Sequence, residues 1–232
     1  MQPTYIPWLG YFALINQVDK FVFLDNVQFN SRSWQQRNRI LNQGKPQWLT
    51  VPVKLPNGRN TTIKDVAIDY EQSFPKHHID SIKRNYAKSA GYQDIENLIF
   101  PILDLKLNSL PELNKRIIVK LCQKLEIDTK FINSSELKSS GKRGELLLAI
   151  TKELEGTTYV SAAGSEEYLR EFDGFKTVGI HLEYQRFFHP EYKQKECQFV
   201  SHLSIVDAIA NEGIQKVREM IKVEISDVTG KV

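Results

Sequence analysis

The fold is decided by two neighbouring stretches near the amino terminus, where residues 1–12 read MQPTYIPWLGYF and residues 20–26 read KFVFLDN. From Trp8 to Val18 apolar side chains recur at helical spacing, and Pro7 stands where a first helical turn tolerates proline. Residues 20–24 form a short apolar run that stops at Asp25, as a buried strand does at a polar loop. A stub of strand at Met1, a helix and a second strand predict a parallel α/β unit.

The rest of the chain continues this mixture of strands and helices. Strands are predicted at 48–53, 61–68, 130–133, 157–161 and 180–184, the first two as a hairpin around the turn at residues 56–58. Helices are predicted near 76–89, 94–106, 111–124, 144–155, 204–210 and 214–221, with a short one ending at Leu169. We expect one α/β domain over residues 1–232, with a Rossmann-like parallel sheet flanked by helices and a helical segment at about 73–124.

The composition limits the class of protein. With 41% hydrophobic residues the chain can bury a core. It has no signal-peptide pattern and no apolar run of the roughly 18 to 20 residues that span a bilayer, so we expect a cytoplasmic protein without a membrane span. Cys122 and Cys197 are far apart, which argues against a disulfide framework or a zinc site. The net charge of +3 suits an anionic metabolite, and without a nucleic-acid motif no nucleic-acid partner is expected.

The first 53 residues have the composition of a binding site. They contain all three tryptophans, interleaved with Arg32, Arg37 and Arg39. Guanidinium groups bind phosphate or carboxylate bidentately, and Arg37 and Arg39 would share one face of a strand, although a solvated charged edge is the ordinary alternative. Four aromatic side chains could stack on a nucleobase or sugar ring, or could simply pack in the core: Tyr5, Trp8, Tyr11 and Trp34.

Amides and one acid complete this predicted site. Gln2 would sit at the carboxyl end of the first strand and Asp25 at the end of the next, the edge at which open α/β sheets bind ligands. Gln28 and Asn38 add further amides, and Gly10 at a helix start would let a nucleotide approach the backbone. We take Asp25 as a candidate catalytic carboxylate and the other four as candidate substrate-binding residues.

The carboxyl-terminal half supplies a candidate base. His189 could accept a proton from an amine, since an unperturbed pKa of about 6.5 suits that role, or it could merely hold a turn before Pro190. Tyr192 and Gln194 follow it as substrate-binding candidates.

A second anion site is a further expectation. Ser161, Gly164 and Tyr168 lie in a predicted strand-to-helix turn whose backbone amides could hold an anion. Asp207, three residues after Ser204, favours a helix cap over a site. No histidines and carboxylates stand at metal-ligand spacing, so no metal site is predicted.

Long motifs in the chain closely resemble the WbqC-like family, which is found in bacterial O-antigen and polysaccharide gene clusters. They are QPTYxPWxGYF from residue 2, DxFVxLDxVQF from residue 19, RNRI from residue 37, WLTVPV from residue 48, TYVS from residue 158 and LSIVD from residue 203. Relatives usually begin several residues earlier with an apolar strand, so we expect most of the first strand to be missing here. Residues 161–164 read SAAG, where relatives tend toward a tighter Ser-Gly turn.

Residues 8–15, WLGYFALI, are also similar in layout to the His-x-Gly-His helix start of nucleotidyltransferases such as pantothenate synthetase. That likeness implies ATP as a cofactor, with magnesium held mainly by its phosphates. Trp8 and Tyr11 occupy the two histidine positions, so the chain lacks the imidazolium charge that adenylyl transfer uses there.

Together the resemblance and the site residues imply an enzyme of surface-polysaccharide assembly. It would transfer an acyl or aminoacyl group, glycyl being one version, onto an amino sugar carried on a nucleotide. The rival is a non-catalytic protein that binds a nucleotide sugar or a glycan. A general base within reach of the anion site would distinguish the two.

Overall fold

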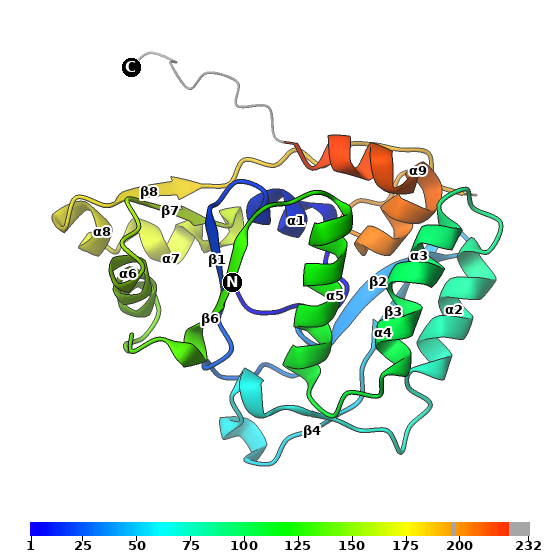
Figure 1. Cartoon of the computed structure of the whole chain (residues 1–232), viewed down its shortest axis with the longest axis horizontal. Helices are drawn as coiled ribbons and strands as arrows, with labels where there is room; N and C mark the ends of the chain where they lie inside the picture. The colour runs from blue at the N-terminus through cyan, green and yellow to red at the C-terminus, as the bar shows by residue number, and fades with distance from the viewer. Residues whose placement is uncertain (196–197, 223–232) are drawn as a thin grey trace.

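The computed structural model describes residues 1–195 and 198–222 (Figure 1). It has a mixed α/β fold. The strands are β1 (Lys20–Phe23), β2 (Arg37–Asn42), β3 (Lys45–Thr50), β4 (Val53–Lys54), β5 (Ala67–Ile68), β6 (Lys130–Asn133), β7 (Thr158–Ser161) and β8 (His181–Tyr184). The α-helices are α1 (Leu9–Ile15), α2 (Lys76–Tyr86), α3 (Tyr92–Leu98), α4 (Phe100–Asp104), α5 (Leu110–Lys124), α6 (Gly144–Glu153), α7 (Glu166–Arg170), α8 (Gly174–Thr177) and α9 (Ile205–Met220).

The strands pair two by two. β1 pairs with β6 and β7 with β8, both in parallel, while β2 pairs with β3 and β4 with β5, both antiparallel. Within the described residues the strands form four two-stranded sheets, so the single Rossmann-like sheet that we expected is not confirmed. The predicted parallel strands are nevertheless present at 130–133, 157–161 and 180–184 within a residue of their expected bounds.

The hairpin differs from the prediction. β3 pairs back onto β2 through a tight turn in which Gln43 and Gly44 both have positive φ, 49° and 72°. Two consecutive positive φ values are the signature of the type I′ turn that suits the twist of a two-stranded hairpin. The segments 48–53 and 61–68 meet only at their ends, where β4 pairs with β5.

The helical segment follows the predicted order. The expected helix at 94–106 is divided into α3 and α4 at Ile99. Ser109 caps α5 by accepting a hydrogen bond from the Glu112 N–H at 3.4 Å. The last two predicted helices are joined as α9, with Gly213 at φ 75° marking the kink between them.

Two hydrophobic clusters hold the structure together. The larger one joins α1, β1, the β2–β3 hairpin, α5 and the first half of α9. The smaller one, around Leu147, Leu169 and Phe175, lies among α6, α7, α8, β7 and β8 on one side of the molecule (Figure 1). Cys122 is buried in the larger cluster as a free thiol, and Cys197 lies outside the described residues.

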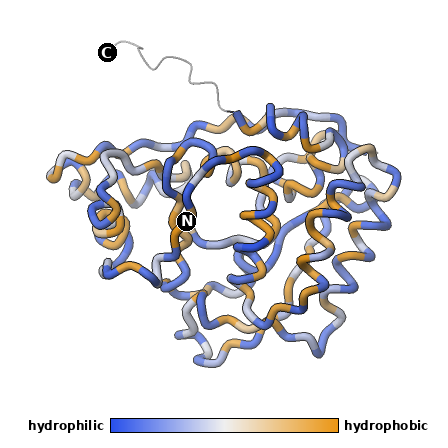
Figure 2. Tube along the Cα trace, viewed as in Figure 1, coloured by the Kyte–Doolittle hydropathy of each residue, from blue (hydrophilic) through white to orange (hydrophobic). Residues whose placement is uncertain are grey.

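Hydrophobic segments alternate with hydrophilic ones along the trace (Figure 2). Among residues 1–195 and 198–222, no helix combines the length and the apolar character needed to cross a bilayer.

Candidate functional site

The carboxyl edge of β1 brings two of the predicted residues together. Met1 lies alongside β1 as a parallel strand would. Its amino group donates to the Val22 carbonyl at 2.7 Å, and the Leu24 N–H donates to the Met1 carbonyl at 2.8 Å. Gln2 and Asp25 therefore follow neighbouring chain segments and lie at the same edge, as the sequence led us to expect.

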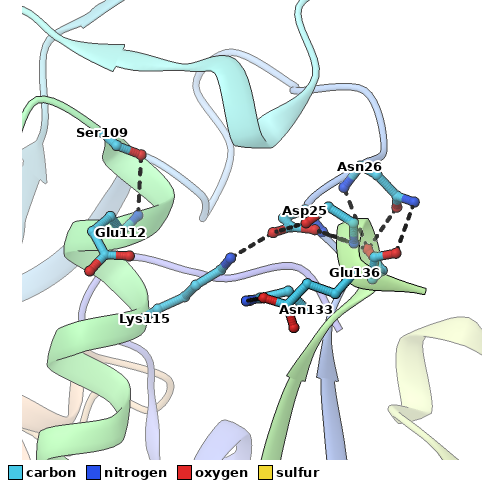
Figure 3. Close-up of polar contacts among 9 residues, drawn as sticks. Asp25, Asn26, Ser109, Glu112, Lys115, Asn133 and Glu136 are labelled. Atoms are coloured by element: carbon cyan, nitrogen blue, oxygen red, sulfur yellow. Dashed lines mark hydrogen bonds and ion pairs between the residues drawn. The ribbon is translucent and has the colours of Figure 1, made fainter. Parts of the chain in front are cut away.

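Asp25 is engaged in a buried ion pair (Figure 3). Its carboxylate lies 2.6 Å from the Lys115 Nζ and accepts hydrogen bonds from the Ser135 N–H and hydroxyl at 2.9 and 3.1 Å. Burial alone would favour the neutral acid, but the hydrogen bond and positive charge of Lys115 outweigh it and lower the pKa of Asp25. Such a carboxylate is a poor proton acceptor, so Asp25 is better suited to holding Lys115 than to acting as a base.

Gln2 ties this edge to the segment before β2. Its Oε1 accepts a hydrogen bond from the Gln35 Nε2 at 2.9 Å, and its carbonyl accepts one from the Tyr11 hydroxyl at 3.0 Å. Asn114 fixes the other side of the same segment by donating to the carbonyls of Gln35 and Pro3 at 2.8 and 3.1 Å. Gln2 is thus held in one orientation at the strand end.

An arginine–tryptophan face, made of Trp34, Arg37, Arg39 and Trp48, lies on the β2–β3 hairpin and the turn before it. The Arg37 guanidinium carbon is 4.1 Å from the centre of the Trp48 ring, and that of Arg39 is 5.6 Å from both indoles. Trp34 and Trp48 are 46% and 42% exposed, which is unusual for tryptophan. The Nε atoms of both arginines are buried without a hydrogen-bond partner among the described residues.

Asn38, between the two arginines, faces the opposite way. Its Nδ2 donates to the carbonyls of Tyr5 and Ile6 at 3.2 and 2.8 Å, and the Tyr5 N–H donates to the Trp34 carbonyl at 2.9 Å. The side-chain alternation of a strand explains this division. Asn38 fixes the amino-terminal loop against the hairpin, and the arginines are left for the outer face.

A histidine cluster, made of Trp8, His189 and His202, is the second feature of the site. The Trp8 ring centre lies 5.9 Å from that of His189, in a stacked geometry, and 4.6 Å from that of His202. The two imidazole centres are 5.3 Å apart. The His189 Nδ1 is 2.9 Å from the Pro190 carbonyl, whereas its buried Nε2 has no partner among the described residues. Since a carbonyl only accepts, Nδ1 carries the proton and Nε2 presents a lone pair.

The histidine cluster adjoins the arginine–tryptophan face. Burial and then the positive charge of Arg39 lower the pKa of His202, and the Ser204 N–H donates to the Arg39 carbonyl at 2.8 Å. Burial, only partly opposed by the Pro190 carbonyl, also lowers the pKa of His189, so this imidazole is neutral at neutral pH. Arg39 therefore lies close to His202, which in turn lies beside the neutral His189.

Several predicted residues belong to the core. Tyr5 is fully buried with its hydroxyl 2.8 Å from the His78 Nδ1, and Tyr11 is 3% exposed and packs against Phe21. Neither presents a ring face to a ligand. The structure therefore supports a packing role for these two tyrosines and not ring stacking on a ligand.

The space above Gly10 is filled by the chain itself. A Cβ at Gly10 would lie 2.2 Å from the Trp8 ring, and the Gly10 carbonyl accepts a hydrogen bond from the Gln185 Nε2 at 2.8 Å. The close approach that requires glycine is made by Trp8 and not left open for a nucleotide. Together with the burial of Tyr11, this does not fit the phosphate position of the nucleotidyltransferases, and we derive no step through ATP.

Other candidates lie at the surface or away from the two features. Gln28 donates to the Arg59 carbonyl at 2.8 Å, and Arg32 is exposed at φ 58° in the loop before Trp34. Ser161 is buried at the end of β7, while Gly164 is exposed with no atom near its missing Cβ, and Tyr168 is 42% exposed.

Tyr192 and Gln194 donate hydrogen bonds to the buried Asp207. The Tyr192 hydroxyl and the Gln194 Nε2 donate to the Asp207 Oδ2 at 2.9 and 2.8 Å, and the Tyr86 hydroxyl donates to its Oδ1 at 2.7 Å. Burial raises the pKa of Asp207, although these donors oppose the shift. The predicted cap is supplied by Ser204, whose Oγ accepts from the Val206 N–H at 3.2 Å. Asp207 instead fixes the loop that carries His189.

Sequence reasoning missed three contributors. Lys115 stands on α5 without a motif, Gln35 precedes the recognised RNRI segment, and His202 was not among the expected site residues. Only the residues flanking His202 gave a signal, since LSIVD follows it directly. No group of three metal-ligating side chains occurs among residues 1–195 and 198–222.

Comparison with known proteins places the chain in a family. No solved structure matches it. The uncharacterized protein Rv1507c of Mycobacterium tuberculosis is 32% identical over 218 residues, which is 93% of each chain. A model of the WbqC-like protein family matches residues 2–219. Because the match covers almost the whole sequence, including the arginine–tryptophan face and the histidine cluster, the chain belongs to the WbqC-like protein family.

Proposed function

We propose that the protein transfers an acyl or aminoacyl group onto an amino sugar carried on a nucleotide. The family suggests a polysaccharide-related role, which is consistent with such a substrate. The observation that carries the proposal is the His189 Nε2, unpartnered among the described residues, in a histidine cluster that adjoins Arg39 through His202.

The arginines and tryptophans suit the nucleotide. Arg37 and Arg39 would bind its diphosphate through charge-assisted hydrogen bonds, which a guanidinium makes in pairs. The exposed indoles of Trp34 and Trp48 would stack on the base or the sugar. Stacking and ion pairing use different parts of the same ligand, so both contacts form at once.

His189 would take up the proton of the reaction. In amide formation the amine nitrogen bonds to the carbonyl carbon of an activated acyl donor, and the bond from that carbon to the leaving group breaks. The leaving group departs with the bonding electrons, and the amine proton passes to the His189 Nε2. The lowered pKa of His189 keeps it in the neutral form that this step needs.

A non-catalytic nucleotide-sugar or glycan binding protein is the second candidate. The exposed indoles of Trp34 and Trp48 favour it, because stacking on a sugar or base ring needs no catalytic base. The ion pair of Asp25 with Lys115 also favours it, because it removes the second predicted catalytic group.

Thermal shifts distinguish binding from its absence, because a ligand that binds the native state raises its stability. The full chain would be screened against UDP-, dTDP- and GDP-linked amino sugars, with and without activated acyl donors. We expect at least one nucleotide sugar to raise Tm and to be converted to its amide. A shift without conversion supports the binding protein, and no shift contradicts both proposals.

A further inference from the structure

β8 is an edge strand at the margin of the molecule (Figure 1). It pairs with β7 along one side, and no strand of the described residues pairs with its other side. The His181 N–H donates to the Thr157 carbonyl at 3.0 Å, so the odd-numbered residues of β8 bond to β7. The peptide groups of Leu182 and Tyr184 therefore point to the open side. A row of such groups is a template for pairing with another strand.

A groove lies between β8 and the helices α7 and α8, with a cavity volume of about 410 Å³. Charged residues of both helices line it, and its apolar lining residues are Leu169, Phe172, Phe175, Ile180, Leu182 and Tyr184. The last three are half-buried, and Tyr168 and Val178, next to lining residues in the chain, are 42% and 43% exposed. A partner that covers this groove would therefore remove apolar surface from water.

The sequence of this edge is complementary to itself. From Ile180 to Tyr184 the chain reads IHLEY, with an apolar residue at each end and at the centre. When two copies pair antiparallel about Leu182, His181 of each copy lies opposite Glu183 of the other. Both side chains are exposed, so the imidazole N–H of one can donate to the carboxylate of the other. Complementary pairs directly across two strands stabilise their association.

The charges and the backbone select this register. A shift of one copy by two residues keeps each side chain on its face but sets the two Glu183 carboxylates opposite each other, which is unfavourable. Centred on Leu182, the two Leu182 peptide groups exchange a pair of hydrogen bonds. Each Tyr184 N–H then meets the Ile180 carbonyl of the other copy. The Ile180 N–H is not needed, since it already donates to the Phe175 carbonyl at 3.0 Å.

We propose that two copies of the protein associate through β8, antiparallel and centred on Leu182. Their β7–β8 pairs would join into one continuous sheet. Ile180, Leu182 and Tyr184 pack on the side of Leu169 and Phe175, so in the pair they would meet their counterparts over the two grooves. The contact uses the same surface of both copies, as a two-fold symmetric dimer requires.

An exchange of charges tests this contact, with the dissociation constant of the dimer measured by sedimentation equilibrium of the full chain. His181→Glu sets two carboxylates opposite each other on both sides of the two-fold axis, so we expect this constant to rise about tenfold or more. Adding Glu183→His to the same chain again sets a histidine opposite each glutamate and should restore the affinity of the parent. His77→Glu, exposed on α2, is the matched control and should leave the dimer intact.

Hydrogen exchange locates the contact independently of any substitution. The Leu182 and Tyr184 amides should exchange more slowly as the protein concentration rises, because their N–H groups become bonded in the dimer. A parent that sediments as a monomer at every concentration would overturn the proposal. A dimer that His181→Glu does not weaken, or that leaves these two amides unprotected, would overturn it as well. No ligand is used, so the outcome is separate from that of the proposed function.

Discussion

At the scale of single residues, Arg39 has the most demanding role in the proposed site. It contacts both exposed indoles and affects the pKa of His202. Replacing Arg39 by lysine keeps the charge but loses the planar fork, so we expect nucleotide-sugar affinity to fall by about 1.5–3 kcal/mol, the range for a hydrogen bond to a charged group. Calorimetric titration measures this loss. Arg84→Lys, at an exposed position of α2, is the matched control and should bind as the parent does.

His189 is expected to govern the pH dependence of the reaction. His189→Gln should lower kcat by about 10²–10⁴, the usual contribution of a general base. In the parent the rate should rise with pH through the lowered pKa of His189 and stay level above it, because only the neutral imidazole accepts a proton. The variant should lose this inflection, while His181→Gln, on exposed β8, should retain it. An inflection that survives in His189→Gln would exclude His189 as the base.

The Asp25–Lys115 ion pair is expected to stabilise the fold. Lys115→Met leaves a buried carboxylate without its partner, so we expect a loss of about 3–5 kcal/mol in the free energy of unfolding. The pKa of Asp25 is lowered on folding, so its contribution is present above the unfolded pKa and is lost as pH falls through the folded value. Denaturant titrations from pH 7 to pH 3 measure both effects. Lys120→Met, exposed on the same helix, should change little.

At the scale of elements, the contact of α3 with α9 depends on a glycine. A Cβ at Gly91 would lie 1.8 Å from the Ile209 carbonyl oxygen, and the Gly91 N–H donates to the Ala210 carbonyl at 3.0 Å. Gly91→Ala must therefore push the two helices apart, and we expect it to lower the free energy of unfolding by about 1–3 kcal/mol. Gly164→Ala, which meets no atom within 4 Å, is the control. Equal stability of the two variants would refute the packing argument.

The elements also show what the sequence can predict. Short runs of apolar residues, or of apolar residues alternating with polar ones, predicted β1, β6, β7 and β8. The β2–β3 hairpin was missed because its turn uses Gln43 at positive φ, a conformation without the usual Asn-Gly signal. The arginines and tryptophans of the candidate site were predicted because they lie close together in the sequence. The link from Arg39 to His202 joins segments 163 positions apart in the numbering and has no local signature.

At the scale of the whole molecule, the amino terminus lies in the interior and titrates with folding. The amino group of Met1 has a pKa of about 5 when folded and an ordinary value of 8.0. Between these values the unfolded chain binds the extra proton, so we expect the free energy of unfolding to rise with pH from about 5 to 8. Acetylating the amino group should remove this slope. A slope of the same size in the acetylated chain would assign it to other groups.

The union of the arginine–tryptophan face and His189 in one ligand site is tested most directly by hydrogen–deuterium exchange of the full chain. The exchange is compared with and without the nucleotide sugar that gives the largest thermal shift. Residues 34–50 and 187–194 should gain protection together, because the ligand would span both segments. Protection confined to one of the two segments, or to the carboxyl edge around Asp25, would contradict a shared site.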